Sequence, residues 1–125
     1  NRRAVYRARG RVLVAGLGIG MVLTAMADKP DVEAITVVER SGDIINAVWP
    51  QLTAKRPKIS AKATIVHADI FEWRPPRGAK YDTIYFDIWP YISRDYLKDM
   101  ARLKQKFRSR RASGAWVGCW AEGLA

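Results

Sequence analysis

The sequence predicts one α/β domain with a mainly parallel sheet of about five strands, and three observations lead to this prediction. Short apolar runs typical of buried strands alternate with helix-length segments along the 125 residues. Hydrophobic residues make up 49% of the chain, enough for an ordinary globular core. A glycine-rich turn joins the first strand to the first helix. Together these features indicate a doubly wound sheet, with helices on both of its faces.

The first half of the chain supplies three of the predicted strands. Residues 1–10 form a basic lead-in, a strand covers residues 12–15, and a helix covers residues 20–27. A second strand at residues 35–38 precedes a helix that Ser41 can cap, and Pro50 should bend or interrupt this helix near Trp49. A third strand covers residues 63–66.

Two more strands are expected in the second half. One covers residues 83–86, after a loop rich in proline. Helical spacing then recurs over residues 96–107, and four residues rich in arginine, 108–111, come near the expected end of this helix. The last strand covers residues 115–120 and includes Cys119. This strand would be an open edge, so we expect a second copy of the chain or a further segment to cover it.

Three alternate glycines, Gly16, Gly18 and Gly20, end the first strand and begin its helix. A turn of this kind lets the backbone approach a nucleotide closely. Its spacing, G-x-G-x-G, differs from the dinucleotide fingerprint G-x-G-x-x-G, because Met21 stands where the third glycine belongs. We therefore expect weak binding of NAD. The alternative is that the glycine turn serves packing alone and binds no ligand.

Acidic residues stand where the next three predicted strands end. Glu39 follows the second strand, Asp69 the third and Asp87 the fourth. The carboxyl ends of parallel strands meet at one edge of a sheet, and ligands bind there at the point where the strand order reverses. An ionised carboxylate accepts hydrogen bonds in a fork, which suits Glu39 to a ribose diol. The pattern predicts a nucleoside-binding crevice.

The glycine turn and Glu39 resemble motif I and the ribose-binding acid of the class I S-adenosylmethionine-dependent methyltransferases and of their relatives, the spermidine synthases. Many methyltransferases carry an acid two residues before the first glycine, whereas Val14 stands here, as in the spermidine synthase branch. The resemblance covers nearly all of the chain and implies a Rossmann-like fold. That family adds two strands and a helix after the fifth strand, so we expect a trimmed or a compact variant.

The resemblance implies S-adenosylmethionine as the cofactor. In the family, an acid at the place of Asp69 accepts from the adenine amino group, and Ile70 would lie against the ring. Asp69 also suits a helix cap before Phe71, and the two roles are compatible. The residues expected to bind the cofactor are Gly16, Leu17, Gly18, Gly20, Glu39, Arg40, Asp69, Ile70 and Asp87.

The loop after the fourth strand is the expected reaction side. It resembles the Asp-x-x-Asp-Pro loop of spermidine synthases, but Pro90 replaces the second acid. We take Asp87 and Trp89 as the candidate catalytic residues: Asp87 would accept a proton or a hydrogen bond from a substrate amine, and Trp89 or Tyr91 would stack on a planar group. Packing of a tight loop is the alternative role of Trp89. Methyl transfer depends mostly on positioning, so a sparse site is compatible with an enzyme.

Basic residues dominate the charge of the chain. Lys and Arg total 22 against 12 acids, a net charge of +10, and eight bases lie between Arg94 and Arg111. Such an excess attracts nucleic acid and repels a polycation. We expect the basic helix to be a solvated face, with nucleic-acid contact as the alternative.

The sequence also argues against several kinds of site. His67 is the only histidine and Cys119 the only cysteine, so we expect no metal centre and no internal disulfide. The longest uncharged run, residues 12–27, is shorter than a membrane span. No secretory signal pattern precedes the first strand, and a cytoplasmic location is expected.

These observations predict an S-adenosylmethionine-dependent transferase, specifically a methyltransferase of the spermidine-synthase-like type. Aminopropyl transfer to a polyamine is one alternative, which the missing second acid and the basic charge disfavour. The other alternative is a non-catalytic module that binds a nucleoside or a nucleic acid. The sequence does not identify the methyl acceptor.

Overall fold

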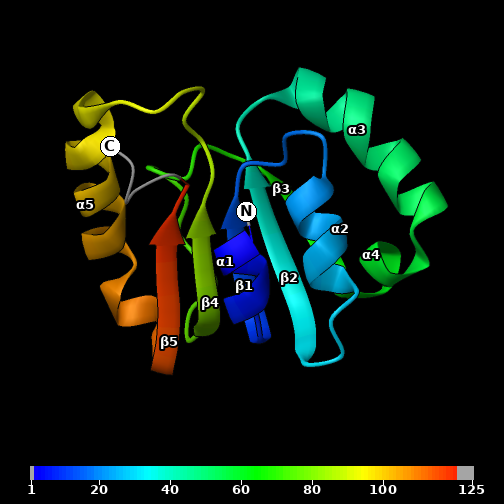
Figure 1. Ribbon diagram of the computed structural model, residues 1–125, viewed down its shortest axis with the longest axis horizontal. Coiled ribbons are helices and arrows are strands. Elements are labelled where there is room, and N and C mark those ends of the chain that lie inside the picture. Colours follow the sequence, from blue (N-terminus) through cyan, green and yellow to red (C-terminus); the bar gives the residue numbers. More distant parts are fainter. Residues whose placement is uncertain (1, 121–125) are drawn as a thin grey trace.

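A computed structural model describes residues 2–120 and contains one sheet of five strands (Figure 1). The strand order is β3-β2-β1-β4-β5, and every pair of neighbours is parallel. This confirms the predicted α/β, doubly wound architecture. Residue 1 and residues 121–125 of the predicted domain lie outside the described residues. The strands are β1 (Gly10–Ala15), β2 (Val32–Glu39), β3 (Ala63–His67), β4 (Tyr81–Phe86) and β5 (Arg111–Cys119).

Helices cover both faces of the sheet because side chains alternate along the central strand. In β1, Val12 and Val14 belong to one core layer, whereas Leu13 and Ala15 belong to the other. The first layer packs against α1 (Arg2–Arg7), α2 (Met21–Ala27), α3 (Gly42–Lys55) and α4 (Pro57–Lys62). The second packs against α5 (Leu97–Lys106). The strand order reverses between β1 and β4, so these two strands flank the expected ligand crevice.

The segment predicted only as a basic lead-in is ordered, which corrects that prediction. Residues Arg2–Arg7 form α1, and β1 begins at Gly10, two residues earlier than expected. Ala4 and Ala8 are fully buried in the first core layer. The ammonium of Lys29 donates to the carbonyl oxygens of Val5, Tyr6 and Ala8 at 2.6, 2.8 and 2.6 Å. The stabilising partner lies more than twenty residues away, so the local sequence gives little sign of the helix.

The predicted interruption at Pro50 is wrong, because α3 continues through this residue to Lys55. The proline lacks one N–H, but Val48 and Leu52 on either side of it pack against the same core layer. The predicted cap is confirmed: the Ser41 hydroxyl accepts a hydrogen bond from the Ile44 N–H at 3.2 Å. A second short helix, α4, follows with Ile59 buried, and the sequence analysis did not predict it.

The basic segment after β4 also differs from the prediction. A 3-10 turn, η1 (Arg94–Tyr96), precedes α5, which ends at Lys106. A second turn, η2 (Arg108–Arg110), leads into β5, so this arginine-rich run connects α5 to the strand. β5 begins four residues earlier than expected and has an irregular register opposite Tyr81 and Thr83. Cys119 is buried in this strand, as predicted.

Candidate functional site

The three glycines of the turn after β1 have positive φ angles of 99°, 54° and 85°, but they serve different purposes. A Cβ atom at Gly16 would lie 2.1 Å from the carbonyl oxygen of Asp87, and one at Gly20 would lie 2.6 Å from Cδ2 of Leu52. A Cβ at Gly18 would meet nothing within 4 Å. Gly16 therefore permits the close approach of β1 to the end of β4, and Gly20 permits the packing of α2 against α3.

Glu39 connects the end of β2 to the glycine turn. Its Oε1 accepts a hydrogen bond from the Leu17 N–H at 2.8 Å, and its Oε2 accepts from the Ser41 N–H at 2.9 Å. Only 9% of the residue is exposed. An ionised carboxylate offers about four acceptor positions, so each oxygen retains one for a ligand. The backbone bonds thus fix the carboxylate in place and leave acceptor positions open in the cleft.

Asp69 organises a turn after β3. Its Oδ1 accepts a hydrogen bond from the Phe71 N–H at 3.0 Å, and its carbonyl accepts from the N–H groups of Glu72 and Trp73. The prediction of a helix after Asp69 is wrong. The turn ends before Pro75, which cannot continue a helix. Ile70 is buried by the turn and Phe71 is half-buried.

His67 and Arg40 form a second small arrangement beside this turn. His67 Nε2 lies 3.0 Å from the carbonyl oxygen of Arg40, within hydrogen-bond distance. The ring therefore supports the chain between β2 and α3, which agrees with the structural role expected for a single histidine. Arg40 itself is exposed at the edge of the site.

Asp87 continues the ladder between β4 and β1 and carries a partly buried carboxyl group. Its N–H donates to the carbonyl oxygen of Ala15 at 2.8 Å. Burial raises the pKa of the Asp87 carboxyl above its ordinary value. A raised pKa makes the carboxylate a better proton acceptor than an exposed aspartate.

The aromatic residues after Asp87 differ in exposure. Trp89 is 6% exposed and belongs to the second core layer, whereas Tyr91 is 60% exposed. The ring centroid of Tyr96 lies 6.2 Å from that of Trp89 and 5.4 Å from that of Tyr91. A hydrogen bond with Tyr91 raises the pKa of Tyr96 to about 12. The packing role of Trp89 is therefore evident, and Tyr91 is the ring that is open to a partner.

One cleft of about 490 Å³ collects most of the predicted residues at the carboxyl ends of the strands, the upper edge of the sheet in Figure 1. Two predicted residues lie outside its walls: Leu17 is buried behind the turn, and Gly20 faces the space between α2 and α3. The predicted residues that line the cleft are Gly16, Gly18, Glu39, Arg40, Asp69, Ile70, Asp87 and Trp89.

The cleft also has walls that the sequence analysis missed. They include Ser41, Ile44, Phe71 and Pro90. Ser41 and Phe71 directly follow predicted site residues, so the neighbouring positions were the available signal. Ile44 lies on the apolar side of α3, where helical spacing suggested only core packing.

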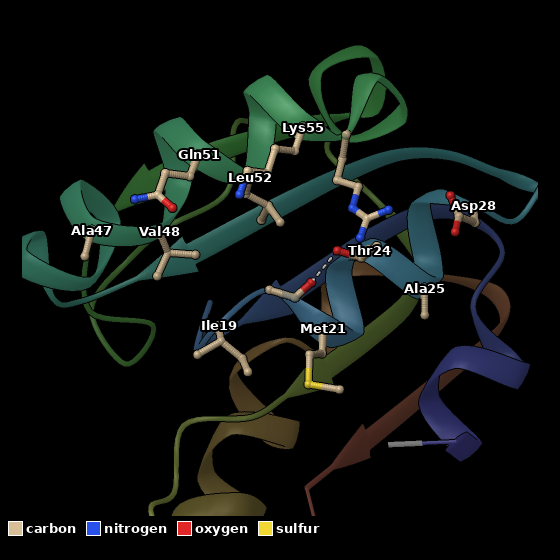
Figure 2. A pocket seen from close by; sticks show the side chains of 12 residues that line it. Ile19, Met21, Thr24, Ala25, Asp28, Ala47, Val48, Gln51, Leu52 and Lys55 are labelled. Carbon is tan, nitrogen blue, oxygen red and sulfur yellow. Dashed lines mark hydrogen bonds between the residues drawn. The ribbon is translucent and has the colours of Figure 1, made fainter.

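A second hollow, of about 680 Å³, lies between α2 and α3 (Figure 2). Figure 2 shows Val48 and Leu52 of α3 on one side and Met21 and Thr24 of α2 on the other. The Thr24 hydroxyl is already bonded to the Gly20 carbonyl at 2.7 Å. Asp28 is the single carboxylate in its lining. Because the cleft collects three carboxylates beside the glycine turn and this hollow has only one, the cleft is the stronger candidate site.

The electrostatic character of the cleft contrasts with the charge of the whole chain. Among residues 2–120, no lysine or arginine nitrogen lies within 4.0 Å of a carboxylate oxygen of Glu39, Asp69 or Asp87. Yet the chain has a net charge of +10. The charge of Asp69 acts on Lys106 from a greater distance. Three carboxylates without a close ion pair suit a ligand that brings a positive charge and several hydrogen-bond donors.

Two kinds of feature are absent from the described part of the chain. No group of three or more His, Cys, Asp or Glu side chains in residues 2–120 is arranged to hold a metal ion. No helix within these residues is long and apolar enough to cross a membrane.

No protein-family model matches the chain, and no curated protein matches its sequence. Solved structures do resemble it. The glycopeptide N-methyltransferase MtfA complexed with sinefungin has 17% identity and a TM-score of 0.71, over 94% of this chain and 46% of that one. The CcbJ methyltransferase from Streptomyces caelestis has 17% identity and a TM-score of 0.71, over 94% and 50%.

A third structure is an S-adenosylmethionine-dependent methyltransferase from Clostridium acetobutylicum, with 16% identity and a TM-score of 0.62, over 90% of this chain and 43% of that one. The chain thus spans about half the length of the structures it matches. These similarities show that the chain has the fold of S-adenosylmethionine-dependent methyltransferases.

Proposed function

We propose that the cleft binds S-adenosylmethionine and that the chain acts as an S-adenosylmethionine-dependent methyltransferase. The observation that carries this proposal is the convergence of Glu39, Asp69 and Asp87 on one cleft beside the glycine turn, with no ion pair to any of them within 4.0 Å among residues 2–120. The shared fold supports it. The chemistry of the cofactor also supports the proposal. Its hydrogen-bond donors are the ribose hydroxyls, the adenine amino group and the ammonium group, and the cleft offers acceptors for them.

Each residue of the cleft has a proposed part in binding. Glu39 accepts from the ribose hydroxyls with the lone pairs that the backbone leaves open. Asp69 accepts from the adenine amino group, and the buried side chain of Ile70 and the stem of Arg40 flank the ring. Gly16 and Gly18 line the cleft, and at Gly18, where a Cβ would meet nothing within 4 Å, the backbone can approach the amino-acid portion closely.

The chemistry requires little from the protein beyond position. S-adenosylmethionine supplies an electrophilic methyl group on a sulfonium, whose leaving group is a neutral thioether. Asp87 and Pro90 line the cleft and would position an acceptor beside this group. Where the acceptor is an amine, the Asp87 carboxylate takes the proton that the amine releases, a role that its raised pKa favours.

The spermidine-synthase-like type remains part of this proposal. It is supported by Val14 at the position where many methyltransferases carry an acid, and by the loop that begins at Asp87. Pro90 replaces the second acid of the aminopropyltransferase loop, so we expect no spermidine from putrescine and decarboxylated cofactor. A cytoplasmic location is also proposed, since the sequence has a single cysteine, Cys119, and an internal disulfide needs two.

Isothermal titration calorimetry tests the binding proposal directly. The wild-type chain should bind S-adenosylmethionine and S-adenosylhomocysteine and should bind NAD poorly, because Met21 replaces the glycine of the dinucleotide turn. Tight binding of NAD, or no binding of either sulfur compound, would contradict the proposal.

Glu39→Ala should weaken cofactor binding by about 1.5–3 kcal/mol, because buried ribose hydroxyls lose a charged acceptor. Glu33→Ala is the matched control: it is the same substitution on the same strand, at an exposed position away from the cleft. Unchanged affinity in Glu39→Ala would remove the ribose assignment. Chemical denaturation of both variants separates this effect from the loss of the bonds to Leu17 and Ser41.

A further inference from the structure

A row of basic side chains runs along one side of the segment formed by η1 and α5. Residues 94–111 contain eight bases and only two acids, Asp95 and Asp99. Spacing of four residues places side chains on one side of a helix. The row consists of Arg94, Lys98, Arg102 and Lys106, of which the first three are exposed.

This row lies against the wall of the cleft. The guanidinium carbon of Arg102 is 5.1 Å from the ring centroid of Phe71, and the ammonium of Lys106 donates to the carbonyl oxygen of Ile70 at 2.8 Å. Ile70 and Phe71 both line the cleft. The basic row therefore borders the candidate cofactor site rather than a remote surface.

Charges of both signs surround Lys106. Burial lowers the pKa of Lys106, the carboxylates of Asp69 and Glu72 oppose this effect, and the charges of Arg74 and Arg102 lower the pKa further. The two arginines are thus close enough to act on the same ammonium. No carboxylate within residues 2–120 forms an ion pair with Arg94, Lys98 or Arg102, so their charges remain available.

An exposed aromatic ring lies beside the start of the row. Tyr91 directly follows Pro90, which lines the cleft, and 60% of the residue is exposed. Its ring packs on Tyr96, two residues after Arg94, with 5.4 Å between the ring centroids. The ring is therefore supported on one side and open to a partner on the other.

We propose that this surface binds single-stranded nucleic acid, with phosphates along Arg94, Lys98 and Arg102 and a base stacked on Tyr91. Basic tracks combined with aromatic rings are what single strands require, because the charges follow the backbone and any base can stack. A base paired in a duplex could not enter the cleft without leaving its stack. The basic helix, which we expected from the sequence to present a solvated face, then binds a specific partner.

A further role of the bound nucleic acid, as the methyl acceptor, rests on the proposed function. In that role, a nitrogen or oxygen of the nucleotide at the mouth of the cleft forms a bond to the methyl carbon. The methyl–sulfur bond breaks and its electron pair stays on sulfur. The proton released by the attacking atom passes to the Asp87 carboxylate.

Fluorescence anisotropy with labelled single-stranded RNA and DNA, titrated at several salt concentrations, tests the surface. The combined variant Arg94→Glu, Lys98→Glu, Arg102→Glu should weaken binding at least tenfold and reduce the log–log salt slope by about 2, from three phosphate contacts at about 0.7 each. Tyr91→Ala should weaken binding about tenfold, because a stacked base is lost, and should leave the slope unchanged.

The matched control reverses three exposed bases over the other face of the sheet: Arg7→Glu, Lys55→Glu, Lys58→Glu. It changes the net charge equally and should retain most of the binding. Equal losses in both triple variants would mean diffuse attraction and would overturn the proposal. Absence of salt-sensitive binding, or binding to phosphatidylserine vesicles in preference to single strands, would overturn it as well.

Calorimetry with S-adenosylmethionine distinguishes the two proposals. The variant with the reversed row should keep its cofactor affinity, because none of its three residues lines the cleft. Cofactor binding without nucleic-acid binding in the wild type would overturn only the surface. Nucleic-acid binding without cofactor binding would overturn only the proposed function.

Discussion

Carboxylates occupy both ends of the sheet, but their partners differ. At the amino end of β4, Asp82 lies 3.7 Å from the guanidinium of Arg9 and accepts the N–H of Arg11 at 2.9 Å. At the carboxyl ends, Glu39 and Asp69 accept backbone N–H groups, and no base within residues 2–120 pairs with them. The amino-end acid has its ion pair within the protein, whereas the carboxyl-end acids have backbone partners and no close ion pair among the described residues.

The glycines at the two ends of β1 also differ in what they contact. Gly10 begins this strand against the side chain of Asp82, and Gly16 follows it against the backbone of Asp87. A Cβ atom at either glycine would approach an oxygen atom to 2.1 Å. The Asp82 side chain can rotate away, but the Asp87 carbonyl belongs to the sheet. The carboxyl end should therefore tolerate change less than the amino end.

The largest expected effect is the loss of stability in Gly16→Ala. Strain at positive φ and the separation of β1 from β4 should together lower the free energy of unfolding by about 4 kcal/mol. Gly10→Ala, also at positive φ, should cost about 2 kcal/mol, because only a side chain must move. Urea denaturation of the two variants measures the difference. Equal losses would contradict the distinction between side-chain and backbone contact.

The second prediction distinguishes an acid that stabilises the fold from an acid that binds the cofactor. Asp82→Asn should lower the free energy of unfolding by about 1 kcal/mol, since its ion pair and its bond to Arg11 are partly exposed, and should leave cofactor affinity unchanged. Asp87→Asn should leave stability nearly unchanged and weaken cofactor binding about tenfold, which corresponds to one charged hydrogen bond. Denaturation and calorimetry on both variants test this. The reverse pattern would assign Asp87 a structural role.

The smallest effect is a dependence on pH. Burial raises the pKa of Asp87, so the folded chain holds this proton more tightly than the unfolded chain does. Its contribution to stability is full below the unfolded pKa and is lost as the pH rises through the folded pKa. Wild type should therefore lose stability relative to Asp87→Asn between acid and neutral pH. Denaturation of both proteins at several pH values checks the sign, and a constant difference would contradict it.

Strand positions and the carboxylates at their ends could be predicted from local pattern, because buried parallel strands are apolar runs and the acids directly follow them. Three features could not. Helix α1 depends on Lys29, and α4 is too short for a helical period to be visible. Gly20 packs against Leu52, a contact between distant segments, so sequence spacing assigned it to the ligand instead. The first and the last of these features depend on contacts made by tertiary structure, and the second depends on the length of the helix.

The hydrogen bonds of the Lys29 ammonium restrict which residue types can occupy position 29. The ammonium bonds to three carbonyl oxygens around the end of α1, at 2.6–2.8 Å, which uses all three of its donors. Those donors point toward three corners of a tetrahedron, whereas the donors of an arginine lie in one plane. Lysine and arginine carry the same charge, yet only lysine has the right shape here. In a chain with 22 basic residues, this cation is specified by geometry.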